Sequence, residues 1–415
     1  MARISLCMIV RDEAEMLPAF LESVRGSWDE LVAVDTGSKD ATPELLAAAG
    51  GTVLHRPWDD DFAGARNFGL ERAGGDWVLV LDADERVGPA LAAELRRATE
   101  DPRCGATSLL VLDRLPHGHA RRSRLLRMFR NDRGIRYRHA IHEDVLEDVT
   151  AFLARSGLRR ADLETPLLHL GYERDRAAEK HKKERDVRIL RAVLARDPSD
   201  HYLRFKLLEQ ARFWGDRALW ASAAAETAAA LEGDGALPLR SAHFAGEMVA
   251  LIADGLHADA GAALSFLESF AGRIPSSAAF ELRRGELLEL LGEAAGARAA
   301  FLSCLVLDGV TGNTQLATVR PRLGLARLAM AAGDLAGAER EGESAIGQAP
   351  LDPEALLLMA TLRRARGGPV ALARFAEERL TASGDHPEIH AAVREATHLA
   401  GDAVAAPRGL ASGNL

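Results

Sequence analysis

Short apolar runs alternate with amphipathic segments through the first 175 residues of the chain. The runs that have the length and composition of buried strands are Arg3–Val10, Glu30–Asp35, Thr52–Arg56, Asp76–Asp82 and Ala106–Asp113. The segments between the first four show helical spacing and are punctuated by Gly or Asp: Glu13–Val24, Thr42–Ala49 and Phe62–Ala73. Strands that alternate with helices form βαβ units, so this half predicts an α/β domain with a mainly parallel sheet.

From residue 176 the pattern is helical only. Glu179–Ala195 is a charged helix, and Ala- and Leu-rich helical segments follow it, separated by Gly, Asp and Pro. A period of about 34 residues is that of tetratricopeptide repeats. The residues that fall at its small, turn, aromatic and terminating positions are Leu251, Ala263, Leu267, Pro275, Gly285, Gly292, Ala297, Phe301, Ala326, Gly333, Ala338, Ala345, Pro350, Ala360 and Gly367. Stacked helix pairs bury a continuous core, so we expect a helical solenoid.

The two patterns define the expected domain organisation. We expect an α/β domain over residues 1–175, a linker helix over 176–197, a repeat domain over 198–403 and a disordered tail over 404–415. The fold class is therefore α/β followed by all-α.

Composition and charge narrow the possible functions. The 415 residues are 47% hydrophobic and 27% charged, and the net charge of −9 argues against general nucleic-acid binding. The three cysteines, Cys7, Cys104 and Cys304, lie far apart without metal-ligand spacing, as expected in a reducing compartment. The N-terminal apolar run is too short for a signal peptide or a membrane span. We therefore expect a cytoplasmic protein without a transmembrane segment; the pattern does not indicate an oligomeric state.

The segment Asp76–Glu85, DWVLVLDADE, carries the clearest chemistry. A buried strand ends there in Asp82 and Asp84, and ligands of parallel sheets collect at the carboxyl ends of the strands. Two carboxylates one residue apart can hold a divalent cation and leave its other positions to substrate phosphates. No GxGxxG motif follows the first strand, so a dinucleotide site is not expected.

Four ordered motifs carry a family resemblance: SLCMIVRDEAEML, VAVDTGSKDAT, WDDDFAGARNFGLERAGGDW and LVLDADE. Over residues 3–200 they resemble family 2 glycosyltransferases with the GT-A fold, in particular the bacterial subgroup in which this domain precedes tetratricopeptide repeats. Asp12 and Lys39 depart from the residues common in that subgroup. The resemblance implies a nucleotide-diphospho-sugar donor such as a UDP-sugar, inversion at the sugar carbon, and Mn²⁺ or Mg²⁺ as cofactor.

The resemblance also implies a donor site. Val10 to Glu13 leave the first strand, where backbone N–H groups can meet the nucleotide-sugar. Asp35 ends the second strand and is expected to accept the N–H of a uracil-like base, with a turn cap as the alternative. Arg66 is expected to bind the donor, with a salt bridge to Asp59–Asp61 as the alternative. Asp82 is expected to contact the ribose or the metal.

The remaining implied roles concern the metal and the proton. Asp84 is expected to bind the metal directly, and His169 either completes the metal site or is structural. Glu143 or Asp144 is expected to be the catalytic base, and we prefer Glu143 because it belongs to the Ile-His-Glu match. His142 is expected to position the acceptor.

The leading hypothesis is a metal-dependent inverting glycosyltransferase whose helical repeats recruit the acceptor: a peptide side chain (including Cys), a protein, or an envelope or metabolite glycan. A sugar nucleotidyltransferase would need a Gly-rich phosphate loop after the first strand, and Met8–Glu15 offers none. The alternative from another class is a catalytically inactive repeat scaffold that binds a peptide or protein.

Overall fold

The computed structural model describes residues 2–114, 120–170, 176–307, 312–350, 352–382 and 387–402. The chain divides into two compact units. The first comprises Met1–Leu115, Arg121–Ala223 and Thr311–Asn313, and the second comprises Pro116–Ala120, Ala224–Val310 and Thr314–Leu415. The first unit thus extends beyond residue 198, where the sequence led us to expect the first repeat. The expected tail, 404–415, lies outside the described residues.

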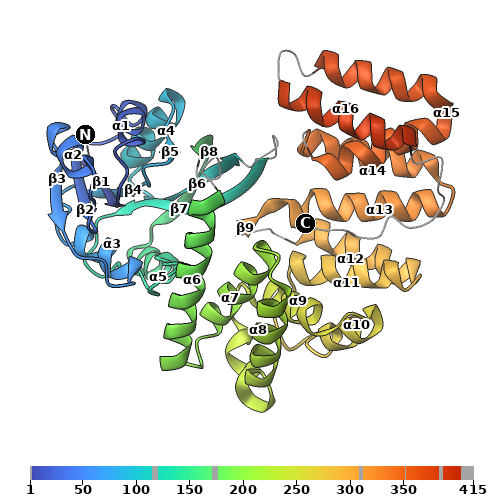
Figure 1. Cartoon of the computed structure of the whole chain (residues 1–415), viewed down its shortest axis with the longest axis horizontal. Helices are drawn as coiled ribbons and strands as arrows, with labels where there is room; N and C mark the ends of the chain where they lie inside the picture. Colours follow the sequence, from blue (N-terminus) through green and yellow to red (C-terminus); the bar gives the residue numbers. More distant parts are fainter. Residues whose placement is uncertain are drawn as a thin grey trace. The chain divides into compact units, whose positions relative to one another are not determined.

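A parallel sheet forms the start of the first unit (Figure 1). Its strands are β1 (Ile4–Val10), β2 (Glu30–Asp35), β3 (Thr52–His55) and β4 (Trp77–Val80), paired in the order β3-β2-β1-β4. The connecting helices are α1 (Leu17–Ser23), α2 (Thr42–Ala48) and α3 (Phe62–Leu70). This alternation confirms the βαβ prediction. α1 is shorter than the predicted helix Glu13–Val24. It begins at Leu17, and Pro18 lies in its first turn, where the missing N–H of proline costs no helical hydrogen bond.

Beyond these four strands the sequence predicted one more, Ala106–Asp113, which is present as β6; it did not single out the other strands or the helices of this region. The further strands are β5 (Glu85–Arg86), β6 (Cys104–Arg114), β7 (Ala120–Arg130), β8 (Arg159–His169) and β9 (Gly312–Asn313). β6 and β8 pair in parallel, whereas β7 with β4, β8 with β5 and β9 with β7 are antiparallel. The helices of this region are α4 (Pro89–Glu100) and α5 (Leu146–Ser156). The result is a mixed sheet in the order β3-β2-β1-β4-β7-β6-β8-β5, built on a parallel core.

Both faces of the sheet are covered. Along β4, Trp77 and Leu79 belong to one hydrophobic core, and Val78 and Val80 belong to another. Leucines and phenylalanine of α1 and α4 fill the first core, while α3 and α5 contribute to the second. A strand buried on both sides must be apolar at every position, which explains the uninterrupted run that made β4 recognisable.

Three helices follow β8: α6 (Arg176–Arg196), α7 (His201–Phe213) and α8 (Arg217–Ala230). Asp200 caps α7 by accepting the N–H of Leu203 at 2.9 Å. α6, α7 and the first half of α8 belong to the sheet-containing unit.

The second unit is built from helix pairs. Its elements are η2 (Gly233–Arg240), α9 (Ala245–Leu256), α10 (Ala260–Glu268), α11 (Ala278–Leu290), α12 (Ala294–Val306), η3 (Thr314–Ala317), α13 (Val319–Ala331), α14 (Leu335–Gln348), α15 (Pro353–Ala382) and α16 (Pro387–Asp402). Within the part of the chain that is described, no helix is both long and apolar enough to cross a membrane.

The expected repeat register is present in these pairs. A Cβ at Gly285 would stand 2.6 Å from the ring of Phe301, so only glycine lets α11 approach α12 this closely. Gly292 turns the chain between them with φ +78°. One repeat later, Gly333 does the same between α13 and α14, and non-helical geometry at Gly367 and Gly368 interrupts α15. The tetratricopeptide-like pattern is therefore confirmed in the fold.

Candidate functional site

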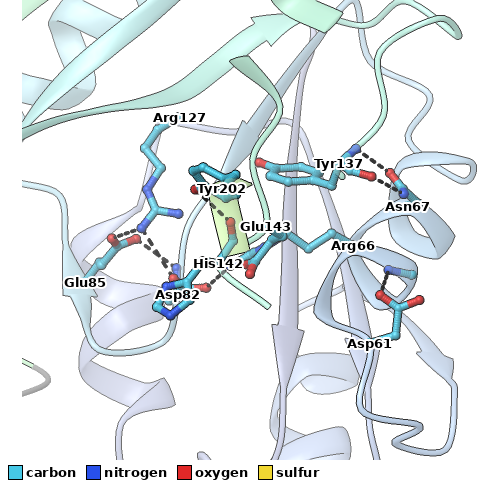
Figure 2. Close-up of polar contacts among 11 residues, drawn as sticks. Asp61, Arg66, Asn67, Asp82, Glu85, Arg127, Tyr137, His142, Glu143 and Tyr202 are labelled. Carbon is cyan, nitrogen blue, oxygen red and sulfur yellow. Dashed lines mark hydrogen bonds and ion pairs between the residues drawn. The ribbon is translucent and has the colours of Figure 1, made fainter. Parts of the chain in front are cut away.

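Arg66 lies at the centre of the site. It sits in the second turn of α3, whose N-terminus is capped by Asp61 through the N–H of Gly64 at 2.8 Å. Its Nε donates to Glu143 Oε1 at 2.6 Å and its Nη2 to Asp82 Oδ1 at 3.1 Å (Figure 2). The side chain is 8% exposed. The alternative expectation for Arg66, an ion pair with Asp59–Asp61, is not what the structure shows.

Tyr137 and Asn67 fix the surroundings of Arg66. The guanidinium lies 5.6 Å from the centre of the buried Tyr137 ring. The side-chain oxygen of Asn67 accepts the N–H of Tyr137 at 2.8 Å, and its NH₂ group donates to the carbonyl of Tyr137 at 2.9 Å. This reciprocal pair ties the segment that leads to Glu143 onto α3, although some 70 residues of chain separate them.

A second arginine continues the charge network. Arg127 of β7 donates through Nη2 to Glu85 Oε1 at 2.6 Å and lies 3.4 Å from Asp82 Oδ2. The other oxygen of Glu85 accepts the N–H of Asp82 at 2.9 Å. Five ionisable groups of alternating charge thus form a row: Glu143, Arg66, Asp82, Arg127 and Glu85 (Figure 2).

The row shifts the protonation equilibria of its members. Burial opposes charge on Arg66, but the adjacent Asp82 and Glu143 outweigh it and raise the pKa of Arg66 well above its usual value. Burial likewise opposes charge on Asp82, and the two arginines nevertheless hold the pKa of Asp82 well below its usual range. Burial raises the pKa of Glu85 to about 7, against the lowering effect of Arg127. Both arginines and Asp82 are therefore charged at neutral pH.

Two donor groups of these arginines have no partner among the described residues: Arg66 Nη1 and Arg127 Nε are buried without a hydrogen bond. Beside Arg66 is a cavity of about 10 Å³, whose lining includes Cys7, Gly69 and Tyr137. That volume suits a single water molecule, which could accept from the arginine.

Asp84 and His169 form the second part of the site. His169 ends β8, and the antiparallel pairing of β8 with β5 brings it opposite Glu85. Its Nε2 lies 3.4 Å from Asp84 Oδ2, with the side chains 24% and 21% exposed. The sheet thus joins the two groups that the sequence predicted as metal ligands.

The donor chemistry of this pair suits a divalent cation, since Mn²⁺ accepts both carboxylate and imidazole ligands. Asp82, the third expected ligand, directs its two oxygens at Arg66 and Arg127. Among the described residues, no group of three or more His, Cys, Asp or Glu side chains is gathered as a metal site. The residues therefore fit a cation held by two side chains and completed by ligand oxygens.

The expected nucleotide residues lie at the ends of β1 and β2. Asp35 is buried at the end of β2; its carboxylate accepts the N–H of Ser38 at 3.1 Å and lies 3.3 Å from Nδ1 of His55. The carbonyl of Val10 accepts both the N–H and the hydroxyl of Thr36. The N–H of Glu13 donates to Thr42 Oγ1 at 2.7 Å.

The two departures from the subgroup pattern contact each other. Asp12 Oδ1 accepts the N–H of Lys39 at 2.7 Å, and the N–H of Asp12 donates to Ser38 Oγ at 2.9 Å. These bonds cross-link the loops after β1 and β2; Asp12 takes part with its side chain and Lys39 with its backbone N–H.

The two candidate bases have different surroundings. Arg66 bonds Oε1 of Glu143, while Oε2 makes no hydrogen bond to a described residue. Asp144 pairs through its backbone with Arg138 and accepts the N–H of Leu146 with Oδ1, at the start of α5. Each candidate thus has one carboxylate oxygen engaged: Glu143 is held by a buried arginine and Asp144 by the backbone at the start of α5.

His142 directly precedes Glu143 and is held by α7. Its carbonyl accepts the hydroxyl of Tyr202 at 3.1 Å, and its Nε2 lies 3.3 Å from Gln210 Nε2. Sequence reasoning did not find Arg127, Tyr137, Tyr202 or Gln210, because their partners lie tens of residues away and no local motif marks them.

The fold joins an α/β domain built on a mixed sheet to helical repeats. Residues 5–155 match the Glycosyl transferase family 2 profile. A TPR repeat-containing protein from Synechococcus elongatus is 43% identical over 209 residues, which cover 50% of this chain and 52% of that protein. The lipopolysaccharide core biosynthesis glycosyltransferase LpsC of Rhizobium meliloti is 30% identical over 167 residues, covering 37% of this chain and 61% of LpsC.

A solved structure, the mannosyltransferase PcManGT from Pyrobaculum calidifontis in complex with GDP-Man and Mn²⁺, shares 16% identity and a TM-score of 0.38, covering 72% of this chain and 81% of that one. This likeness is too low to inform the donor or the metal. The sheet-containing part of the chain carries the family 2 glycosyltransferase domain over residues 5–155, and tetratricopeptide-like repeats follow it. The chain spans about half the length of the first of its curated relatives.

Proposed function

We propose that this chain is a metal-dependent, inverting glycosyltransferase that moves a sugar from a nucleotide-diphospho-sugar, taken to be a UDP-sugar, to a hydroxyl or thiol. The observation that carries the proposal is the position of Arg66. One buried guanidinium contacts both Asp82, at the carboxyl end of the parallel sheet, and Glu143. A donor bound at that edge would lie between the nucleotide residues and a carboxylate able to take a proton.

The proposed reaction is a single displacement. Glu143 accepts the acceptor proton at Oε2 while the acceptor oxygen or sulfur forms a bond to the sugar C1, and the bond from C1 to the diphosphate breaks. Arg66 keeps Glu143 in place through Oε1. Asp144, whose Oδ1 accepts the N–H of Leu146, is the alternative base, and Glu143 is preferred because it belongs to the Ile-His-Glu match.

The donor's nucleotide would occupy the edge formed by Val10, Glu13 and Asp35, with Asp35 accepting an N–H of the base. Asp84 and His169 would hold Mn²⁺ or Mg²⁺. Such a cation neutralises charge on the diphosphate as it leaves. Arg66 and Asp82 would complete the contacts to the donor.

The repeats are proposed to recruit the acceptor, a peptide, a protein or a glycan, because stacked helix pairs present extended surfaces to partners. An inactive scaffold is the alternative. It predicts that no nucleotide binds. The contacts of Arg66 with Asp82 and of Asp84 with His169 support the enzyme over the scaffold.

A thermal-shift screen of nucleotide-sugars with and without Mn²⁺ tests the proposal. A ligand at 100 times its Kd stabilises the folded chain by about 2.7 kcal/mol through mass action. We expect at least one UDP-sugar to raise the melting temperature only with the metal, and free UDP to do the same. No shift with any nucleotide would contradict the proposal and favour the scaffold.

A further inference from the structure

The loop before the candidate base has an unusual backbone. His139 and His142 have φ of +66° and +54°, the left-handed region that residues with a Cβ enter at an energetic cost. Such conformations persist where surrounding contacts fix them, and they are frequent at functional sites.

The fixing contacts come from α7. The Tyr202 hydroxyl donates to the carbonyl of His142 at 3.1 Å, a bond drawn in Figure 2. The Tyr202 ring also packs on His139, with the ring centres 4.6 Å apart. His139 Nδ1 in turn lies 3.3 Å from Asp200 Oδ2, at the cap of α7. One turn of helix thus holds both left-handed residues.

A chain of directional hydrogen bonds determines the form of the His142 imidazole. The indole N–H of Trp214 can only donate, and it meets Gln210 Oε1 at 2.8 Å. This fixes the amide of Gln210, so its NH₂ group faces His142 Nε2 at 3.3 Å. An amide NH₂ can only donate, so Nε2 must be an acceptor without a proton. The proton of neutral His142 must then be on Nδ1, which has no hydrogen-bond partner among the described residues.

The electrostatic surroundings agree with a neutral ring. Burial, together with the positive charges of Lys206 on α7 and Lys182 on α6, lowers the pKa of His142 to about 3. The acids closest in sequence are Glu143 and Asp144, and Glu143 is engaged by Arg66.

We propose that Trp214, Gln210 and Tyr202 are positioning residues for the transfer reaction: they hold His142 as the Nδ1–H tautomer, in the left-handed conformation that leads into Glu143. In that state His142 presents one N–H donor, suited to an oxygen of the acceptor or the sugar. The catalytic part of this inference rests on the proposed function, while the tautomer and its cause do not.

The tautomer can be measured without turnover. In the full chain with ¹⁵N-labelled histidine, the two ring nitrogens report which of them carries the proton. The sequence has 13 histidines, so loss of a signal in His142→Gln provides the assignment. We expect the Nδ1–H form of His142 to be unchanged between pH 7.5 and 5.5. An Nε2–H form, or titration near the usual pKa of a histidine, would overturn the proposal.

Replacing the amide donor of Gln210 by a carboxylate acceptor tests the cause. In Gln210→Glu, one carboxylate oxygen still accepts from Trp214, and the other now accepts from His142. We therefore expect the His142 proton to move to Nε2 and its pKa to rise by at least two units. An unchanged tautomer in a folded Gln210→Glu chain would contradict the proposed hydrogen-bond relay.

If that variant does not fold, Trp214→Phe provides a second test, because it frees the Gln210 amide to rotate. We then expect a mixture of His142 tautomers, and a single Nδ1–H form would contradict the relay equally.

The catalytic consequence is tested by Tyr202→Phe, which keeps the ring and removes only the hydroxyl bond to His142. We expect kcat for sugar transfer, or for donor hydrolysis, to fall about tenfold with the donor KM unchanged. Lys183→Gln is the matched control, because it removes a 2.9 Å ion pair with Asp216 in the same unit without touching the loop. Equal kcat in the two variants would overturn the positioning role. Absence of turnover in the unmodified chain would instead contradict the proposed function, and the tautomer measurements would still decide the relay.

Discussion

Arg66 and Glu143 are separated by 77 positions in sequence and by 2.6 Å between Nε and Oε1 in the folded chain. Glu143 precedes α5 and Arg66 lies on α3, so the bond exists only when the sheet and both helices are assembled. It links the residues proposed to bind the donor to the residue proposed to take the proton.

The metal contribution is tested by Asp84→Asn. The carboxylate lies 3.4 Å from His169, and its side chain is about one-fifth exposed, so the fold should tolerate an amide. We expect Mn²⁺-dependent donor binding and transfer to be abolished with less than about 1 kcal/mol lost in stability. Titration calorimetry with UDP and Mn²⁺ measures this directly. Near-normal turnover would remove Asp84 from the metal site, and unchanged metal affinity in His169→Ala would make His169 structural.

Asp35→Ala tests the nucleotide position. Loss of a hydrogen bond that involves a charged group costs roughly 1.5–3 kcal/mol, so we expect UDP affinity to fall about 10- to 100-fold. Asp35 also accepts the N–H of Ser38, so Asp35→Ala removes a turn contact as well. The variant Asp35→Asn keeps an oxygen for Ser38 and removes the negative charge, which distinguishes loss of the turn from loss of base recognition. If both variants bind UDP normally, the base lies elsewhere.

Arg127→Met tests the structural part of the charge row. Glu85 is 1% exposed, and removal of its arginine leaves a buried carboxylate with only one hydrogen bond. We expect unfolding free energy to fall by about 3 kcal/mol in urea titrations. Arg124→Met on the same strand is the control, since its partner Glu164 is 75% exposed and the pair should contribute less than about 1 kcal/mol. Adding Glu85→Gln should restore part of the loss; equal losses in the two arginine variants would contradict the account.

The low pKa of His142 gives a pH dependence with a definite sign. The folded chain keeps His142 neutral down to about pH 3, whereas the unfolded chain takes up a proton below about pH 6.5. Stability should therefore fall as pH decreases through that window, by at most about 2 kcal/mol at pH 5 from this residue. The difference in pH slope between the unmodified chain and His142→Gln isolates the effect from other groups. Identical slopes would show that His142 is not buried in neutral form.

The sequence predicted the parts of the fold whose signals are local. β1 to β4 are apolar runs bounded by turn residues, and the repeat glycines occur where helix pairs approach or turn. β7 escaped prediction because the arginines at 124, 127 and 130 make it look polar, although Arg127 is buried against Glu85 and Asp82. The carboxylates of the site were recognisable at strand ends, as was Arg66 in its motif. The contacts of α7 with His139 and His142 depend on packing across about 60 residues, and no spacing rule encodes them.

The central claim is that Glu143, held by Arg66, is the base of a glycosyl transfer. The most direct measurement compares UDP binding and Mn²⁺-dependent release of UDP from a UDP-sugar in the unmodified chain, Glu143→Gln and Asp144→Asn. We predict that Glu143→Gln binds UDP normally but turns over about 10² to 10⁴ times more slowly, while Asp144→Asn retains most of its rate. Unchanged turnover in Glu143→Gln would contradict the claim, whether the large loss then occurs in Asp144→Asn or in neither variant.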